Sequence, residues 1–143
     1  MTEARSRKVF INLPVLDLPT SKKFYEALGF RFNPMFEDET AACMILSEEA
    51  YVMLLTKAKF ELFTKKPTAD ATQQAGALYA LACENREEVD ALVKKAVAAG
   101  GSHALEPQDH GFMYQWSFYD PSGHHWEVFY MDEAAFASQQ QQQ

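Results

Sequence analysis

The chain has 143 residues, 48% of them hydrophobic, which is enough for one ordinary domain with a sizeable apolar core. Its net charge of −7 argues against nucleic acid as a partner, because phosphate contacts need clustered Lys and Arg. No apolar stretch approaches the roughly 20 residues that cross a bilayer, and no h-region follows the charged N-terminus, so we expect a cytoplasmic protein that does not bind membranes.

The first half of the chain predicts one strand, one helix and three more strands after an N-terminal extension at residues 1–7. A β-branched run at 9–18 leads into a helix at 20–30, with Asp17 as its N-cap, Pro19 in its first turn and Gly29 at its end. Strand-like runs follow at 30–36, 40–47 and 51–56. Pro34 marks the first of these three as an edge or bulged strand.

Residues 57–77 form a long connection with polar and small residues at its end. Connections of this length are often lids or flexible linkers. Phe60, Leu62 and Phe63 recur at near-helical spacing, so part of the segment is expected to fold over a cavity or against a partner subunit.

The second half repeats the order of the first. A strand at 77–83 precedes a helix at 85–101, which Asn85 and Glu88 begin as a capping box. Strands are then predicted at 102–108, 113–119 and 124–131. The Gln-rich tail, 133–143, ends in "ASQQQQQ", which cannot pack into a core, and is predicted to be disordered.

The whole pattern is βαβββ twice, in modules at 8–56 and 78–132, which predicts an α+β fold. Phe10 and Leu78 are equivalent positions of the repeat, 68 residues apart. In each strand the alternation of side chains gives one face to the helix and one to a cavity.

Two stretches carry a family resemblance. "NLPVLDLPTSKKFYEALGF" and "FYDPSGHHWEVFY" resemble the opening and closing segments of the vicinal oxygen chelate superfamily, also named glyoxalase/bleomycin resistance/extradiol dioxygenase. The resemblance covers roughly residues 8–132. It implies curved mixed sheets that enclose a cavity, and a homodimer in which modules pair within or between chains.

The metal enzymes of that superfamily use one ligand from each of four strands. By resemblance these positions fall on Phe10, on Met53 or Leu54, on Leu78 and on Glu127. A single carboxylate does not hold a divalent ion tightly, and methionine is a soft ligand. We therefore expect no metal and no other cofactor. The alternative is an altered site in which Glu127 and His125 hold Ni, Zn, Fe or Mn.

The resemblance thus implies a protein that binds a small, partly apolar molecule, either to sequester it or to convert it by acid–base chemistry centred on Glu127. A glyoxalase-like lyase with an altered metal site is the second hypothesis. The third is an interaction module whose cavity is filled by its own side chains.

Further contacts to the ligand are expected from residues that share the cavity face or the loop beside it. His124 is instead expected to point its ring to solvent from a turn, and both cysteines are expected to be reduced inside apolar strands. The partner of Asn12 is either a ligand or backbone. The full set of substrate-binding candidates is Phe10, Asn12, Met53, Leu78, His110, Met113, Tyr114, Gln115 and His125.

Overall fold

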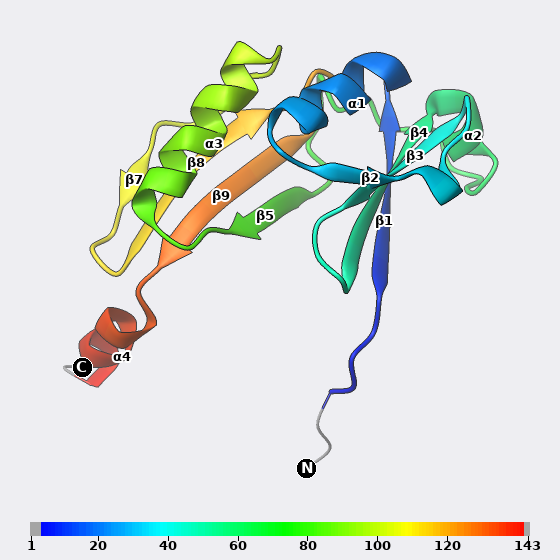
Figure 1. Cartoon of the computed structure of the whole chain (residues 1–143). Helices are drawn as coiled ribbons and strands as arrows, with labels where there is room; N and C mark the ends of the chain where they lie inside the picture. The colour runs from blue at the N-terminus through cyan, green and yellow to red at the C-terminus, as the bar shows by residue number, and fades with distance from the viewer. Residues whose placement is uncertain (1–3, 142–143) are drawn as a thin grey trace. The chain divides into compact units, whose positions relative to one another are not determined.

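The computed structural model describes residues 4–141, which fold into two compact units, Met1–Ala69 and Asp70–Gln143. Each unit is a mixed sheet with a helix on one face (Figure 1). The repeated βαβββ order and the α+β class are confirmed. Along the chain, the boundary between the two units falls inside the predicted connection 57–77.

Unit 1 is a four-stranded sheet in the order β1-β4-β3-β2, in which β1 and β4 are parallel and the other pairs antiparallel. As predicted, β2 is an edge strand, and it ends where Pro34 begins a short 3-10 turn. The elements are β1 (Val9–Val15), α1 (Leu18–Ala27), β2 (Arg31–Asn33), η1 (Pro34–Phe36), β3 (Ala41–Ile45), β4 (Ala50–Thr56) and α2 (Lys57–Glu61).

Helix α1 begins at the residue that the sequence indicates. Asp17 caps it by accepting a hydrogen bond from the backbone N–H of Thr20 at 3.0 Å. The helix buries Phe24 and Tyr25 against the sheet, where every second residue of β4 and β3 faces it, including the fully buried Val52 and Met44. This face is the core of unit 1.

Unit 2 repeats the arrangement, in the order β5-β9-β8-β6 with β7 also paired to β8. The strand predicted at 102–108 is split into two short strands. Pro107 cannot donate to a ladder, and the N–H of Leu105 donates to the Ser117 hydroxyl instead of to a strand. The elements are β5 (Leu78–Ala82), α3 (Arg86–Ala98), β6 (Ser102–His103), β7 (Gln108–Asp109), β8 (Met113–Tyr119), β9 (His125–Met131) and α4 (Glu133–Gln141).

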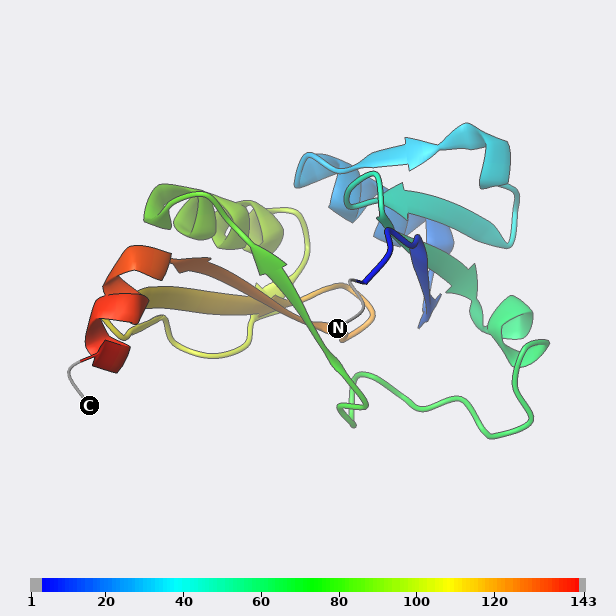
Figure 2. The same cartoon turned by 90° about the horizontal axis from the view of Figure 1, so that it is seen from below.

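Helix α3 covers one face of the second sheet. Asn85 caps it through a 2.8 Å bond from the N–H of Glu88, and Val93 is among its fully buried residues. Trp126 and Phe118, which are opposite each other on β9 and β8, supply the large side chains beneath the helix. Figure 2 shows α3 lying along the sheet of its own unit.

The structure adds detail to the connection and corrects the tail. The connection 57–77 starts with helix α2, capped by Thr56, in the part where Phe60, Leu62 and Phe63 recur at near-helical spacing. The tail predicted to be disordered forms α4 up to residue 141, while 142 and 143 lie outside the described residues. Asp132 caps α4 through a 3.0 Å bond from the N–H of Ala135, and Phe136 packs on Phe112. None of the helices in the described part is long and apolar enough to cross a membrane.

Candidate functional site

The face of each sheet that is turned away from its helix is called the open face. On unit 2 it includes Glu127, which lies opposite Ala80 on β5 and Ser117 on β8. One step along the strands, His125 lies opposite Leu78 and Tyr119. Strand β9 therefore carries His125 and Glu127 between the two strands that flank it.

The polar centre of the open face is a contact within strand β9. His125 Nε2 lies 2.8 Å from Glu127 Oε1, and the two side chains are only 11% and 20% exposed. The ring of Tyr119 meets the His125 ring edge-on at 5.3 Å. When Glu127 is ionised it can only accept, so Nε2 donates and a neutral imidazole keeps Nδ1 as an acceptor.

The side chains around this pair are apolar, and some of them are small. Leu78 is 60% exposed, and Ala80 and Ala82 are exposed on the same face of β5. Further along, Phe129 lies opposite Gln115, whose amide donates to Gln108 at 3.0 Å. The face thus offers one carboxylate–imidazole pair beside apolar surface, and none of its strand residues is a lysine or an arginine.

The open face of unit 1 is more apolar. Phe10 stacks on Tyr51 at a centroid separation of 4.7 Å, and Met53 lies opposite Asn12. Asn12 donates to the backbone carbonyl of Phe10 at 3.4 Å, so its partner in this structure is backbone.

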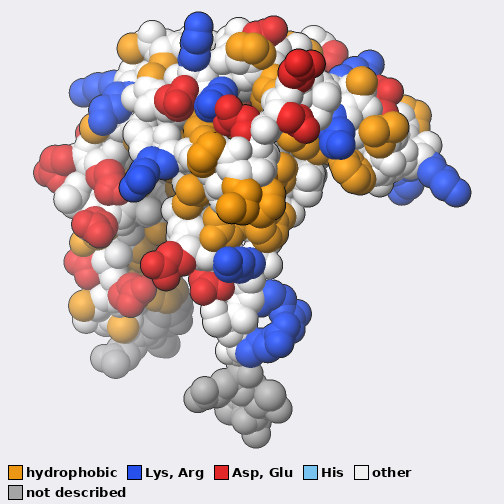
Figure 3. Space-filling view, turned by 45° about the vertical axis from the view of Figure 1, so that its right-hand side comes forward, with side chains coloured by type: hydrophobic (Ala, Val, Ile, Leu, Met, Phe, Trp, Pro, Cys, Tyr) orange, Lys and Arg blue, Asp and Glu red, His pale blue; other side chains and the backbone are white. Residues whose placement is uncertain are grey.

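Hydrophobic side chains gather beside the basic N-terminal arm (Figure 3), where Val9, Phe10 and Ile11 are 52%, 47% and 36% exposed. These three residues open strand β1. Both faces of the start of this strand are therefore apolar and accessible.

The register of β4 decides which residue occupies the second metal position of the resembled family. Leu54 is fully buried on the helix side, whereas Met53 lies on the open face, opposite Cys43 and Asn12. The four positions are then Phe10, Met53, Leu78 and Glu127, which supply a single hard donor. No group of three or more His, Cys, Asp or Glu that could hold a metal occurs in the part of the chain described. These residues do not fit the metal of that family.

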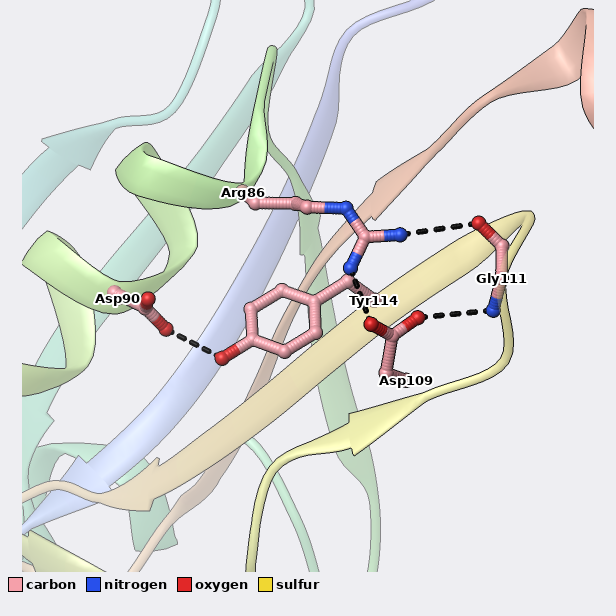
Figure 4. A network of polar contacts seen from close by, with 5 residues as sticks. All are labelled: Arg86, Asp90, Asp109, Gly111 and Tyr114. Carbon is pink, nitrogen blue, oxygen red and sulfur yellow. Dashed lines mark hydrogen bonds and ion pairs between the residues drawn. The ribbon is translucent and has the colours of Figure 1, made fainter.

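Tyr114, a candidate from the sequence, does not join the open face. It lies on the helix side of β8, where its hydroxyl donates to Asp90 of α3 at 2.5 Å and Arg86 covers its ring at 5.3 Å (Figure 4). Arg86 also pairs with Asp109 at 2.6 Å and donates to the carbonyl of Gly111. The Asp90 carboxylate raises the pKa of Tyr114 to about 12, and Arg86 lowers that of Asp109.

His124 differs from the expectation, whereas the ligand contact expected of His110 stays a prediction. His110 is exposed in the β7–β8 hairpin, beyond Met113, and so lies away from the residues opposite Glu127. His124 does not point to solvent: it is 8% exposed, and its ring meets the ring of Tyr79 edge-on. Its backbone N–H donates to the Asp120 carboxylate, which orders the turn before β9.

The two cysteines do not form a disulfide. Burial raises the pKa of the Cys43 thiol. Burial, and then the neighbouring Glu88, raise the pKa of Cys83 to about 12. At neutral pH both remain thiols, which are poor nucleophiles.

The structure thus brings Leu78, Met113, Gln115, His125 and Glu127 to one face of unit 2, and Phe10, Asn12 and Met53 to one face of unit 1. Sequence reasoning did not single out Tyr119, Tyr51 or Gln108. Tyr119 could have been found from the sequence, because strand alternation places it on the same face as Gln115 and Ser117. Across the predicted turn it pairs with His125. The contacts of the other two depend on strand register.

Comparisons with known proteins agree with this fold. Residues 9–128 match the family model described as Glyoxalase/Bleomycin resistance protein/Dioxygenase superfamily. A hypothetical protein from S. aureus is 29% identical, with a TM-score of 0.74 over 89% of this chain and 95% of that one. A glyoxalase-related enzyme from Fulvimarina pelagi is 21% identical, with a TM-score of 0.73 over 88% of both chains.

A glyoxalase/bleomycin resistance protein/dioxygenase family enzyme from Burkholderia phytofirmans PsJN is 19% identical, with a TM-score of 0.71 over 85% of this chain and 96% of that one. No curated protein matches the chain. The two likenesses at 19% and 21% identity concern the fold alone.

Proposed function

Because the chain belongs to the Glyoxalase/Bleomycin resistance protein/Dioxygenase superfamily, we propose that it binds a small, partly apolar molecule on the open face of unit 2, without the metal of that family. The observation that carries this proposal is the His125–Glu127 pair, set beside the exposed Leu78, Ala80 and Ala82. Such a mixture of apolar surface and a few polar groups is typical of small-molecule sites.

The pair also defines the chemistry that is available. Glu127 orients the imidazole, while Nδ1 of His125 accepts a proton from a bound molecule with an acidic C–H or O–H group. A molecule without such a group is only held. Binding is thus the common step, and turnover depends on the molecule bound.

The chemistry of the face narrows the ligand further. Its strand residues include a carboxylate and no lysine or arginine, so an anionic group near Glu127 would be repelled without compensation. Neutral or cationic molecules with hydrogen-bond donors and an apolar body suit the face better.

The test combines thermal unfolding in a small-molecule screen with metal analysis of the purified protein. We expect substoichiometric metal, and hits that raise Tm in the wild type but not in Glu127→Gln. Glu87→Gln, the same change at an exposed position in the first turn of α3, is the matched control and should keep the hits.

Three results would contradict the proposal. Stoichiometric Ni, Zn, Fe or Mn that is lost in Glu127→Gln would favour the metalloenzyme with an altered site. Absence of any hit, with little metal, would favour an interaction module. Hits that Glu127→Gln retains would move the binding site away from the open face of unit 2.

A further inference from the structure

Two side-chain amides contact each other on the open face of unit 2, one step along the sheet from Glu127. Gln115 on β8 lies opposite Phe129 of β9 on one side and opposite Gln108 of β7 on the other. The Nε2 of Gln115 donates to the Oε1 of Gln108 at 3.0 Å. Gln115 is partly buried, whereas Gln108 is exposed. We call these two residues the amide pair.

Strand β7 is held to its neighbours on both faces of the sheet. Successive side chains of a strand point to opposite faces, so Gln108 reaches Gln115 on the open face while Asp109 points to the helix side. There Asp109 pairs with Arg86 of α3 at 2.6 Å (Figure 4). Since this ion pair fastens the hairpin from the helix side, the amide pair is available on the open face to a bound molecule.

The amide pair has hydrogen-bonding groups to spare. Each glutamine amide carries one carbonyl acceptor and two N–H donors. The bond between the two side chains uses one N–H of Gln115 and the carbonyl of Gln108, and neither amide makes another hydrogen bond within the described residues. The carbonyl of Gln115 remains as an acceptor, and N–H groups of both amides remain as donors. A donor beside an acceptor complements another amide.

We propose that the amide pair recognises a carboxamide group on the molecule bound at the open face, and that Gln115 selects this group. The inference rests on the proposed function, because it assigns a second polar group to the same ligand. The carboxamide N–H donates to the Gln115 carbonyl, and the carboxamide carbonyl accepts from an N–H of the pair. An ester has no such donor, and a carboxylate is repelled by Glu127. Gln108 is a positioning residue, because its carbonyl fixes how the Gln115 amide is turned.

The spacing along the strands sets the length of such a ligand. Glu127 and Phe129 are two residues apart on β9, which is about 6.5–7 Å along the strand. Phe129 and Ala82 lie in the same row across the sheet as Gln115 and offer apolar contact between the two polar ends. A benzene ring with a carboxamide at one end and a hydroxyl group at the other spans this separation, with the hydroxyl directed to His125. The probe is therefore para-hydroxybenzamide.

The experiment measures the dissociation constants of para-hydroxybenzamide and methyl para-hydroxybenzoate by NMR titration of the full chain. We expect the ester to bind the wild type about fivefold more weakly, which is the loss of one hydrogen bond at a partly exposed site. In Gln115→Met, which keeps the length of the side chain without its polar atoms, the two probes should bind equally. Equal binding to the wild type, no binding of para-hydroxybenzamide, or a preference that Gln115→Met retains would overturn the inference.

Variants of β7 separate recognition from the attachment of the hairpin. Gln108→Met should lose the preference for the amide probe, whereas Gln108→Glu should keep it, because a carboxylate still accepts from the Gln115 N–H. Asp109→Asn is the matched control: it weakens the ion pair on the helix side and should keep the preference. Circular dichroism establishes that each variant is folded. Loss of the preference in Asp109→Asn would show that attachment of the hairpin sets it, and would refute recognition by the amide pair.

Glu127→Gln distinguishes failure of this inference from failure of the proposed function. If both probes bind the wild type equally and both weaken in Glu127→Gln, the proposed function stands and recognition of the carboxamide is refuted. If the amide preference is lost in Gln115→Met while Glu127→Gln binds both probes as the wild type does, the amide pair acts as proposed and the role given to Glu127 fails.

Discussion

At Gly123 the backbone adopts φ +95, a conformation that side chains other than glycine rarely allow. The position is also crowded, because a Cβ atom there would lie 2.6 Å from the carbonyl oxygen of Ala71. This glycine sits in the turn that Asp120 orders by accepting from the N–H groups of Ser122 and His124. The turn fixes where β9 begins and hence where His125 and Glu127 lie.

We therefore expect Gly123→Ala to lower the free energy of unfolding by about 2–4 kcal/mol, through both the strained φ and the backbone clash. Gly100→Ala is the control, because Gly100 has φ +115 but open space around it, so it should cost only about 1 kcal/mol. Urea unfolding at equilibrium measures both values. Equal losses would show that residues 70–72 do not hold the turn.

The elements of unit 2 are joined by polar contacts as well as by the core. Tyr114 on β8 donates to Asp90 on α3, and Arg86 at the start of that helix holds Asp109 of the neighbouring hairpin. Helix and hairpin are thereby fixed to each other at the end of the sheet where β8 begins. Tyr114, which the sequence suggested as a ligand contact, therefore faces the helix and joins it to the hairpin.

Tyr114→Phe should lower the free energy of unfolding by about 1 kcal/mol at neutral pH, because it removes one hydrogen bond. The folded chain holds the Tyr114 proton up to a pKa of about 12, against an ordinary value of 10.0, so this stabilisation is complete below pH 10 and is lost between pH 10 and about 12. The free energy of unfolding, measured with denaturant at a series of pH values over that range, should fall less steeply with pH in the variant than in the wild type. In contrast, Tyr130→Phe should match the wild type, since the Tyr130 hydroxyl has no hydrogen bond among the described residues.

Helix α4 depends on one capping carboxylate and one aromatic contact. We expect Asp132→Ala to weaken the helix by about 1 kcal/mol, which is about a fivefold faster exchange of its amide hydrogens. Hydrogen exchange followed by mass spectrometry reports this, with α3 in the same chain as the internal reference. Unchanged exchange in α4 would mean that Asp132 does not act as its cap.

Element boundaries show what local sequence can and cannot indicate. Asp17 and Asn85 predict the starts of α1 and α3 because capping is a short-range effect. The composition of the tail suggests disorder, yet its Ala and Gln are adequate helix formers once Asp132 caps the chain and Phe136 finds Phe112. That last contact joins distant segments, which a local pattern does not reveal.

The fold of the whole molecule was therefore more predictable than its site. The repeat and two motifs identify both modules, because hydrophobic periodicity and turn residues are local signals. The position of Glu127 on the open face follows from alternation along β9. Its bond to His125, the inward Tyr114 and the buried His124 depend on rotamers and on packing between strands, which sequence spacing does not determine.

The overall charge leads to a prediction at the scale of the whole molecule. With a net charge of −7 at pH 7 and an isoelectric point near 5.0, the chains repel one another at neutral pH and lose this repulsion on acidification. We expect solubility to pass through a minimum near pH 5, measured as protein remaining after centrifugation across a pH series. Constant solubility from pH 7 to 4.5 would contradict this.

One side of each sheet ends in very short strands: β2 has three residues, and β6 and β7 have two each. On the other side of unit 1, β1 contains Pro14, which has no N–H to offer, and the Asn12 amide already bonds the Phe10 carbonyl. A growing fibril needs a long row of unsatisfied backbone groups as its template. These strands present few such rows, which leaves β5 (Leu78–Ala82) as the proline-free outer strand on which a second backbone could be templated.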